Sequence, residues 1–212
     1  STKQIFQGLV TSADYVYHLE KIGQNRYKQT KKDKSTIEVN IEDEIMHPLV
    51  SGTDAKRYIL PDSNMRILFP YKIENDKGVL IPAKEFEKDY PLAWKYLLSN
   101  EKDLRSRENS KMDNDTKWWG YVYPKSLDKQ KFPKLLIPRL IISLFAVRDD
   151  THEYFLDNVD VGGILVKEKE DLFFLGGILN APVANFVWRR ISKPFQNDYR
   201  SANKQFIAPL PI

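Results

Sequence analysis

The residue types best suited to chemistry gather between positions 118 and 142. Residues 118–123 hold four aromatic side chains, and Lys125 follows them. Further along, a short apolar run at 135–137 is bracketed by prolines and flanked by Lys134 and Arg139. A base stacks on an aromatic face and a phosphate pairs with a cation, so this mixture suits nucleic acid. The alternative is a buried strand with ordinary flanking charges and two tryptophans packed beneath a loop.

Residues that could catalyse a reaction are sparse. The three histidines, His18, His47 and His152, are not spaced as metal ligands on one element would be. The glycine pairs at 162–163 and 176–177 match no phosphate-binding fingerprint. The chain has no cysteine, which excludes disulfides, thiolate nucleophiles and cysteine-ligated zinc. These observations favour a binding module with no catalytic residues and no metal ligands.

Two triplets resemble part of a metal-dependent nuclease site. They are Asp54-Ala55-Lys56, with Asp62 as a companion, and Asp115-Thr116-Lys117. Such a site needs several carboxylates around a divalent cation. Triplets of this kind also arise by chance in any charged chain, so a small nuclease is kept as an alternative.

Composition indicates a globular protein with a modest basic excess. The chain has 212 residues, 42% of them hydrophobic and 29% charged, with a formal net charge of +4. This excess permits an anionic partner without requiring one. No apolar run reaches the length of a membrane span and no signal peptide is evident, so we expect a cytoplasmic protein with no membrane partner. The abrupt ends at Ser1 and Ile212 suggest a piece of something longer.

Hydrophobic periodicity predicts strands alternating with helices. Strands are expected at 15–19, 37–41, 65–70, 135–137, 143–147, 154–156 and 161–166. The basic run at 21–34 is expected to be a solvated hairpin edge, with an edge that faces phosphate as the alternative. Helices are expected at 47–51, ending at Gly52, and over 82–108, where Pro91 suits a first turn, 171–180 and 183–191. The prediction is one α/β (α+β) domain over 1–212, with a mixed, mostly antiparallel sheet and packed helices.

The order of motifs resembles the TaqI-like target-recognition (specificity) domain of adenine-specific DNA methyltransferases and type IIG restriction–modification enzymes. The matching features in chain order are Gly8 with Thr11 and Asp14; Pro48-Leu49 with Gly52, Asp54, Arg57 and Tyr58; Tyr90-Pro91, Tyr96-Leu97, Leu104, Arg107 and Trp118; Pro133-Lys134 with Pro138; the run 174–180; and Pro209-Leu210-Pro211. The departures are Ser12, where the family has a glycine, and Ala181, where it has a serine.

The resemblance implies a function for this chain and for a partner. The family's catalytic Asn-Pro-Pro-Tyr and its cofactor-binding glycine turn do not occur here. The chain is therefore expected to read double-stranded DNA in a bacterial restriction–modification system, without catalytic residues or a cofactor of its own. The preceding N-terminal methyltransferase domain would bind S-adenosylmethionine and take the flipped adenine. The resemblance leaves open whether the parent also cuts DNA.

Basic and aromatic side chains in or beside loops are the candidates for DNA contact, because base edges and phosphates are reached by such groups. These candidates are Lys56, Arg57, Arg105, Arg107, Trp119, Lys134, Arg139, Lys193, Arg200 and Lys204. Arg107 and Lys134 match family positions, and Trp119 is expected to be more exposed than Trp118. The main alternative is a protein-interaction or assembly domain whose basic loops are merely solvated, which would expose an apolar patch.

Overall fold

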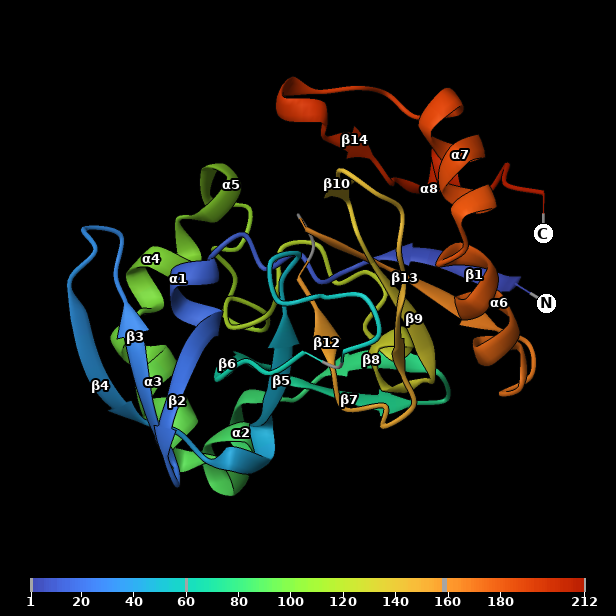
Figure 1. The fold of residues 1–212 in the computed structure, drawn as a ribbon. Helices are drawn as coiled ribbons and strands as arrows, with labels where there is room; N and C mark the ends of the chain where they lie inside the picture. Colours follow the sequence, from blue (N-terminus) through green and yellow to red (C-terminus); the bar gives the residue numbers. More distant parts are fainter. Residues whose placement is uncertain (1, 60, 158–159, 212) are drawn as a thin grey trace. The chain divides into compact units, whose positions relative to one another are not determined.

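The computed structural model describes residues 2–59, 61–157 and 160–211, so the terminal Ser1 and Ile212 noted above lie outside the described residues (Figure 1). The fold is α+β, as predicted, and the chain forms two compact units. Unit 1 comprises Ser1–Gly8, Val50–Ser63 and Lys129–Ile212, and unit 2 comprises Leu9–Leu49 and Asn64–Asp128. The prediction of one domain stays a prediction, and each unit is described by itself.

Unit 1 is built on a four-stranded sheet. Its strand order is β1 (Thr2–Gln7), β13 (Val161–Val166), β9 (Lys134–Pro138) and β11 (Val147–Asp149). The three strand pairings are antiparallel. All five residues of β9 are buried, as expected for an apolar run in a central strand.

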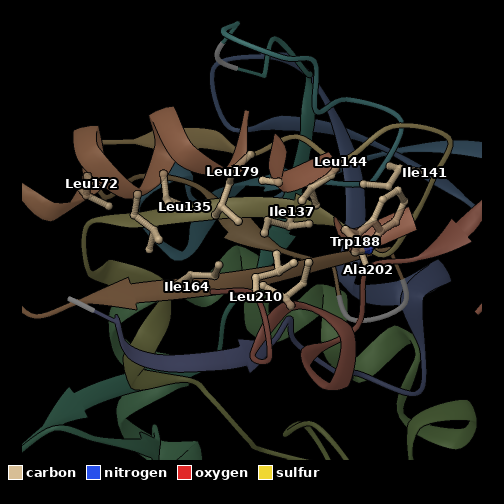
Figure 2. Close-up of a cluster of buried hydrophobic side chains, with 14 residues drawn as sticks. Leu135, Ile137, Ile141, Leu144, Ile164, Leu172, Leu179, Trp188, Ala202 and Leu210 are labelled. Atoms are coloured by element: carbon tan, nitrogen blue, oxygen red, sulfur yellow. The ribbon is translucent and has the colours of Figure 1, made fainter. Parts of the chain in front are cut away.

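Helices α6 (Asp171–Leu179) and α7 (Pro182–Ile191) cover this sheet. Leu172, Leu175 and Leu179 recur at helical spacing and are buried against the sheet residues Leu135, Ile137 and Ile164 (Figure 2). Trp188 of α7 belongs to the same cluster and donates a hydrogen bond from Nε1 to the carbonyl oxygen of Ser201 at 3.1 Å. The apolar face of this helix pair is therefore part of the core of unit 1.

The remaining elements of unit 1 are short. They are β10 (Leu140–Ile141), paired with β14 (Arg200–Ser201); β12 (Phe155–Leu156); the 3₁₀ turns η2 (Asp128–Lys131) and η3 (Gln196–Asp198); and α8 (Lys204–Ile207). Gly8 passes so close to the chain at 156–157 that a Cβ there would lie 2.3 Å from the carbonyl oxygen of Leu156. Only glycine allows this approach.

Unit 2 carries a second antiparallel sheet with short helices. Neighbouring strands are β5 (Met46–Val50), β6 (Met65–Leu68), β2 (His18–Gly23), β3 (Arg26–Thr30) and β4 (Thr36–Asn40), and β7 (Tyr71–Glu74) pairs with β8 (Lys77–Leu80). The helical segments are α1 (Asp14–Tyr17), η1 (Asp43–Ile45), α2 (Ala83–Asp89), α3 (Pro91–Ser99), α4 (Glu101–Arg105) and α5 (Arg107–Ser110). Aromatic rings fill the interior: Tyr17 and Tyr71 both pack edge-on against Tyr121, with ring centroids 5.0 and 5.1 Å away.

Several predicted elements are wrong in unit 2. Residues 47–51 form no helix; His47 instead lies opposite Ile67 in the β5–β6 ladder, so strand pairing overrides the local helix-stop signal of Gly52. The expected helix over 82–108 is broken into four, at Tyr90, Asn100 and Ser106. Tyr90 and Asn100 take non-helical backbone angles (φ −135° and −109°). Residues 14–17 form α1 before β2 begins.

Most of the elements predicted for unit 1 are confirmed. The helices expected at 171–180 and 183–191 and the strands at 135–137, 154–156 and 161–166 are confirmed, with ends shifted by a few residues. The strand expected at 143–147 is wrong except at Val147, where β11 begins.

Candidate nucleic-acid interface

Arg107 was predicted to be displayed to DNA, and the structure corrects this. The side chain is 6% exposed. Its guanidinium donates to the carbonyl oxygens of Leu104 (2.8 Å), Thr11 (2.9 Å), Trp118 (2.7 Å) and Gly120 (2.9 Å). The positive charge therefore joins three separate segments of unit 2 by their backbone carbonyls, which is a structural role.

Lys134 is also not a surface cation. Its side chain is fully buried, and Nζ lies 2.7 Å from Oδ2 of Asp149 and donates to the carbonyl oxygen of Gln130 at 2.6 Å. Burial away from water lowers the pKa of the Lys134 ammonium, against the opposing effect of the Asp149 carboxylate. The other oxygen of Asp149 accepts from the backbone N–H of Thr151. The pair thus fixes the turn after β11 and cannot reach a phosphate.

The expectation that Trp119 is the more exposed tryptophan is wrong. Trp118 and Trp119 are 3% and 2% exposed. Trp119 donates from Nε1 to the carbonyl oxygen of Ile81 at 3.0 Å, and both rings pack against Trp94. Trp118, Trp119 and Tyr121 are therefore core residues, and Tyr123 is half-buried.

Arg105 is partly exposed, but three carboxylates surround it. Its nitrogens lie 2.8 Å from Glu101, 3.1 Å from Asp113 and 2.7 Å from Asp115. A phosphate would have to displace these acids, so Arg105 is a poor anchor for DNA. The basic run at 21–34 is partly neutralised in a similar way.

Within that run, four cations pair with acids. Lys21 pairs with Asp43, Arg26 with Glu38, Lys28 with Glu20 and Lys32 with Asp103. The N···O distances are 2.8 to 3.2 Å. This arrangement fits the solvated strand edge expected for the run.

Six candidates remain, and all of them belong to unit 1: Lys56, Arg57, Arg139, Lys193, Arg200 and Lys204. Four of them are brought together. The β10–β14 ladder places Ile141 opposite Arg200, and the backbone N–H of Ser201 donates to the carbonyl oxygen of Lys193 at 3.0 Å (Figure 1). Arg139 donates from Nε to Asn203 Oδ1 at 2.8 Å and lines the same small cavity of ≈ 140 Å³ as Lys204.

Sequence reasoning missed neighbours of these four. Arg190 is exposed at the end of α7, with its guanidinium 3.4 Å from the centroid of the Phe186 ring. Phe195 and Tyr199 are 49% and 39% exposed, and Lys193 lies 5.4 Å from the Phe195 centroid. The signal was present in the sequence, since residues 189–204 hold five cations and the single acid Asp198.

We define the tail surface as Arg139, Arg190, Lys193, Phe195, Tyr199, Arg200 and Lys204. Arg200 donates to the carbonyl oxygens of Arg189 (2.6 Å) and Ser192 (3.2 Å), so it closes the C-terminal end of α7 and suits the helix dipole there. Asp198 is held by Arg189 at 2.8 Å, and this hydrogen bond lowers the pKa of Asp198. The one acid of the segment is thereby already paired.

Three cations of the tail surface are left for an outside anion. Arg190, Lys193 and Lys204 are exposed, and none of the ion pairs within the described ranges involves them. Arg190 and Lys193 stand beside the exposed rings of Phe186 and Phe195, and the same segment carries the exposed amides of Gln196 and Asn197. Chemically, this arrangement offers phosphate contacts, a stacking face and hydrogen-bonding amides on one short segment.

Lys56 and Arg57 lie elsewhere in unit 1. Arg57 donates to the carbonyl oxygen of Leu144 at 2.9 Å and to Ser143 Oγ at 3.3 Å, so it anchors the loop that carries it. Lys56 is exposed. Neither residue belongs to the tail surface.

The acids of the nuclease-like triplets have structural contacts. Asp54 accepts hydrogen bonds from the backbone N–H and the hydroxyl of Ser51, and Asp115 pairs with Arg105. Among the residues that the structure describes, no three acid or histidine side chains gather as cation ligands.

No single helix in the described ranges is long and apolar enough to cross a membrane. The bent pair α6 and α7, at 64° to each other, meets the length and composition of a span together. Its apolar face is the core face shown in Figure 2.

No protein-family model matches the chain, and no curated protein shows significant similarity to it. The resemblance to TaqI-like target-recognition domains therefore stays a prediction.

Proposed function

We propose that the chain is a recognition module for double-stranded DNA, and that the tail surface is its DNA-contacting face. The observation that carries this proposal is a segment of unit 1 with three exposed cations that have no acidic partner, two of which stand beside exposed aromatic rings. Phosphate contacts by such cations supply affinity and fix the register on the duplex.

The proposal includes a division of labour within a larger assembly. In line with the sequence resemblance, the module serves an adenine-specific methyltransferase or type IIG restriction–modification enzyme in the bacterial cytoplasm. A separate catalytic domain brings S-adenosylmethionine and the chemistry. This chain supplies position and sequence discrimination, and the exposed amides of Gln196 and Asn197 are the groups suited to reading adenine edges.

The test is a salt titration in which fluorescence anisotropy measures the affinity of the chain for a labelled random-sequence duplex. We expect Arg190→Gln/Lys193→Gln/Lys204→Gln to weaken binding and to lower the slope of log affinity against log salt by about 2 to 3, since each lost phosphate contact removes about 0.9. Each of the three side chains is exposed, so the fold should be unaffected.

The matched control removes the same net charge from unit 2. Lys84, Lys88 and Lys95 are exposed on α2 and α3, and their change to Gln should leave the slope near that of the parent chain. Equal slopes for the two triple variants would refute the tail surface as the DNA face. Absence of salt-sensitive binding at low salt would refute DNA recognition by this chain alone.

A second candidate function has its own observation. Phe173, Phe174, Val183 and Phe186 of α6 and α7 are 56 to 73% exposed, which is the kind of apolar surface expected of a protein-interaction domain. If association were the function, sedimentation would show concentration-dependent self-association or binding of a partner. A paired change of Phe174 and Val183 to Ser would abolish it, and the tail variants would leave it unchanged.

A further inference from the structure

A pocket of ≈ 690 Å³ lies in unit 1 between the loop at 56–59 and α6. We call it the α6 pocket, and the lining residues used below are Tyr58, Ile59, Arg148, Phe173, Gly176 and Gly177. Its volume is in the range of sites that enclose small organic groups. Leu135 and Leu172, drawn in Figure 2, line its apolar interior.

Two glycines keep the helix side of the pocket open. A Cβ at Gly177 would meet nothing within 4 Å, and one at Gly176 would meet only Leu135, at 3.4 Å. A side chain at either position would project into free space. The pair is therefore not required by packing, and the space it leaves is available to a ligand.

Aromatic rings stand at the mouth of the pocket. Phe173 is 58% exposed and Tyr58 is 76% exposed. The guanidinium of Arg148 lies 3.9 Å from the Phe173 ring centroid and is held by Asp150 at 2.8 Å. Ring faces and a flat guanidinium are the groups on which unstacked bases rest.

The loop that presents Tyr58 is held in place. The backbone N–H of Ile59 donates to the carbonyl oxygen of Lys56 at 3.1 Å, and Arg57 is anchored to Leu144. Tyr58 takes a left-handed backbone angle (φ 64°), which is unfavourable for a bulky residue. The turn thus holds the ring in an exposed position, with the exposed cation of Lys56 beside it.

We infer that the α6 pocket binds one unstacked nucleotide of the bound nucleic acid, with the base against the rings of Tyr58 and Phe173 and the phosphate near Lys56. The inference deepens the proposed function and rests on it. It also accounts for features that duplex contact by the tail surface leaves without a role: the loop of Lys56 and Tyr58 and the glycine pair of α6. An apolar side chain of a partner protein is the competing occupant, and the experiment below separates the two.

Three labelled duplexes of one sequence test the inference by fluorescence anisotropy. The first is fully paired, the second carries one unpaired nucleotide, and the third has an abasic sugar in place of that nucleotide. We expect the unpaired nucleotide to raise affinity roughly 5-fold or more over the paired duplex, as one stacked base does. The abasic duplex should lose this gain, because its backbone is the same but there is no base to stack.

Variants locate the gain within the molecule. Tyr58→Ala and Phe173→Ala should abolish it. Gly177→Leu should abolish it by filling the pocket, since a Cβ at this position meets nothing within 4 Å. Val183→Ala is the matched control, because Val183 is 73% exposed on α7 and does not line the pocket. Circular dichroism and thermal melting confirm that each variant is folded.

Each outcome decides the matter. A base-dependent gain that the pocket variants remove supports the inference. Equal affinity for all three duplexes, or a gain unaffected by the pocket variants, overturns the inference and leaves the proposed function in place. Binding of the unpaired duplex without binding of the paired one supports the pocket and overturns duplex recognition. No binding of any duplex at low salt overturns both.

Discussion

Arg107→Ala should strongly destabilise unit 2, although the sequence alone placed this residue on the DNA surface. The guanidinium makes four hydrogen bonds to backbone carbonyls, and the side chain is 6% exposed. No water can replace these bonds readily in the interior. Truncation leaves the carbonyl oxygens of Thr11 and Trp118 without the donor that holds them.

The magnitude follows from the number of bonds and the cost of burying the charge. A hydrogen bond from a charged group contributes about 1.5–3 kcal/mol, so four would sum to roughly 6–12 kcal/mol. Desolvation of the buried cation offsets several kcal/mol of this. We therefore expect a net loss of about 4–5 kcal/mol in the free energy of unfolding, which is the upper end for a single substitution. Arg107→Lys keeps a charge with fewer donors and should lose about half as much.

The assay is urea unfolding monitored by tryptophan fluorescence. Trp94, Trp118 and Trp119 all lie in unit 2 and report on it directly. The matched control is Arg105→Ala, which removes a partly exposed arginine paired on the surface and should cost far less stability than Arg107→Ala. An Arg107→Ala protein within 1 kcal/mol of the parent, with reduced DNA affinity, would refute the structural role.

Three further predictions concern burial elsewhere. Lys134→Met should cost about 3–5 kcal/mol in urea unfolding, because Asp149 is left as a buried charge without its cation. Burial raises the pKa of Tyr17 to about 12, so the folded state keeps this proton after the unfolded chain loses it. The stability that Tyr17 contributes is complete below about pH 10 and falls by roughly 3 kcal/mol as pH rises to about 12, which an alkaline unfolding titration measures. Gly177→Ala should raise stability by about 0.5–1 kcal/mol in thermal melts, since its Cβ meets nothing. Gly8→Ala should lower stability by at least about 2 kcal/mol, because its Cβ clashes with the backbone. Equal melting temperatures for these two variants would contradict the local geometry.

The sequence predicted those parts of the fold in which the local pattern and the tertiary environment agree. Helix α6 has buried leucines at helical spacing, and β9 is an apolar run bounded by prolines, so both were found. The helix predicted at 47–51 was wrong because a helix-stop glycine is only a local signal. The strand that pairs with these residues, β6, lies elsewhere in the chain. The break at Tyr90 was marked by Pro91, which takes the first turn of α3, whereas the break at Asn100 left no mark in the hydrophobic period.

The exposure of the candidate site residues could likewise be predicted only where the local sequence decides it. Lys193 and Lys204 were predicted because a charge in a polar tail is exposed in almost any fold. Arg107 and Lys134 were misassigned because their partners are backbone carbonyls and an acid brought in by tertiary structure, and no local pattern reports such partners. Arg190 could have been found, since its segment holds five cations to one acid.

Lysine footprinting shows whether the tail surface contacts DNA, because it compares all exposed amines in one experiment. The protein is acetylated with and without saturating duplex at low salt, and the modified sites are quantified by mass spectrometry. The account predicts protection of Lys193 and Lys204, with Lys84 and Lys88 of α2 modified equally in both samples. Protection confined to the basic run at 21–34, or equal modification at every lysine despite bound DNA, would contradict the tail surface as the DNA face.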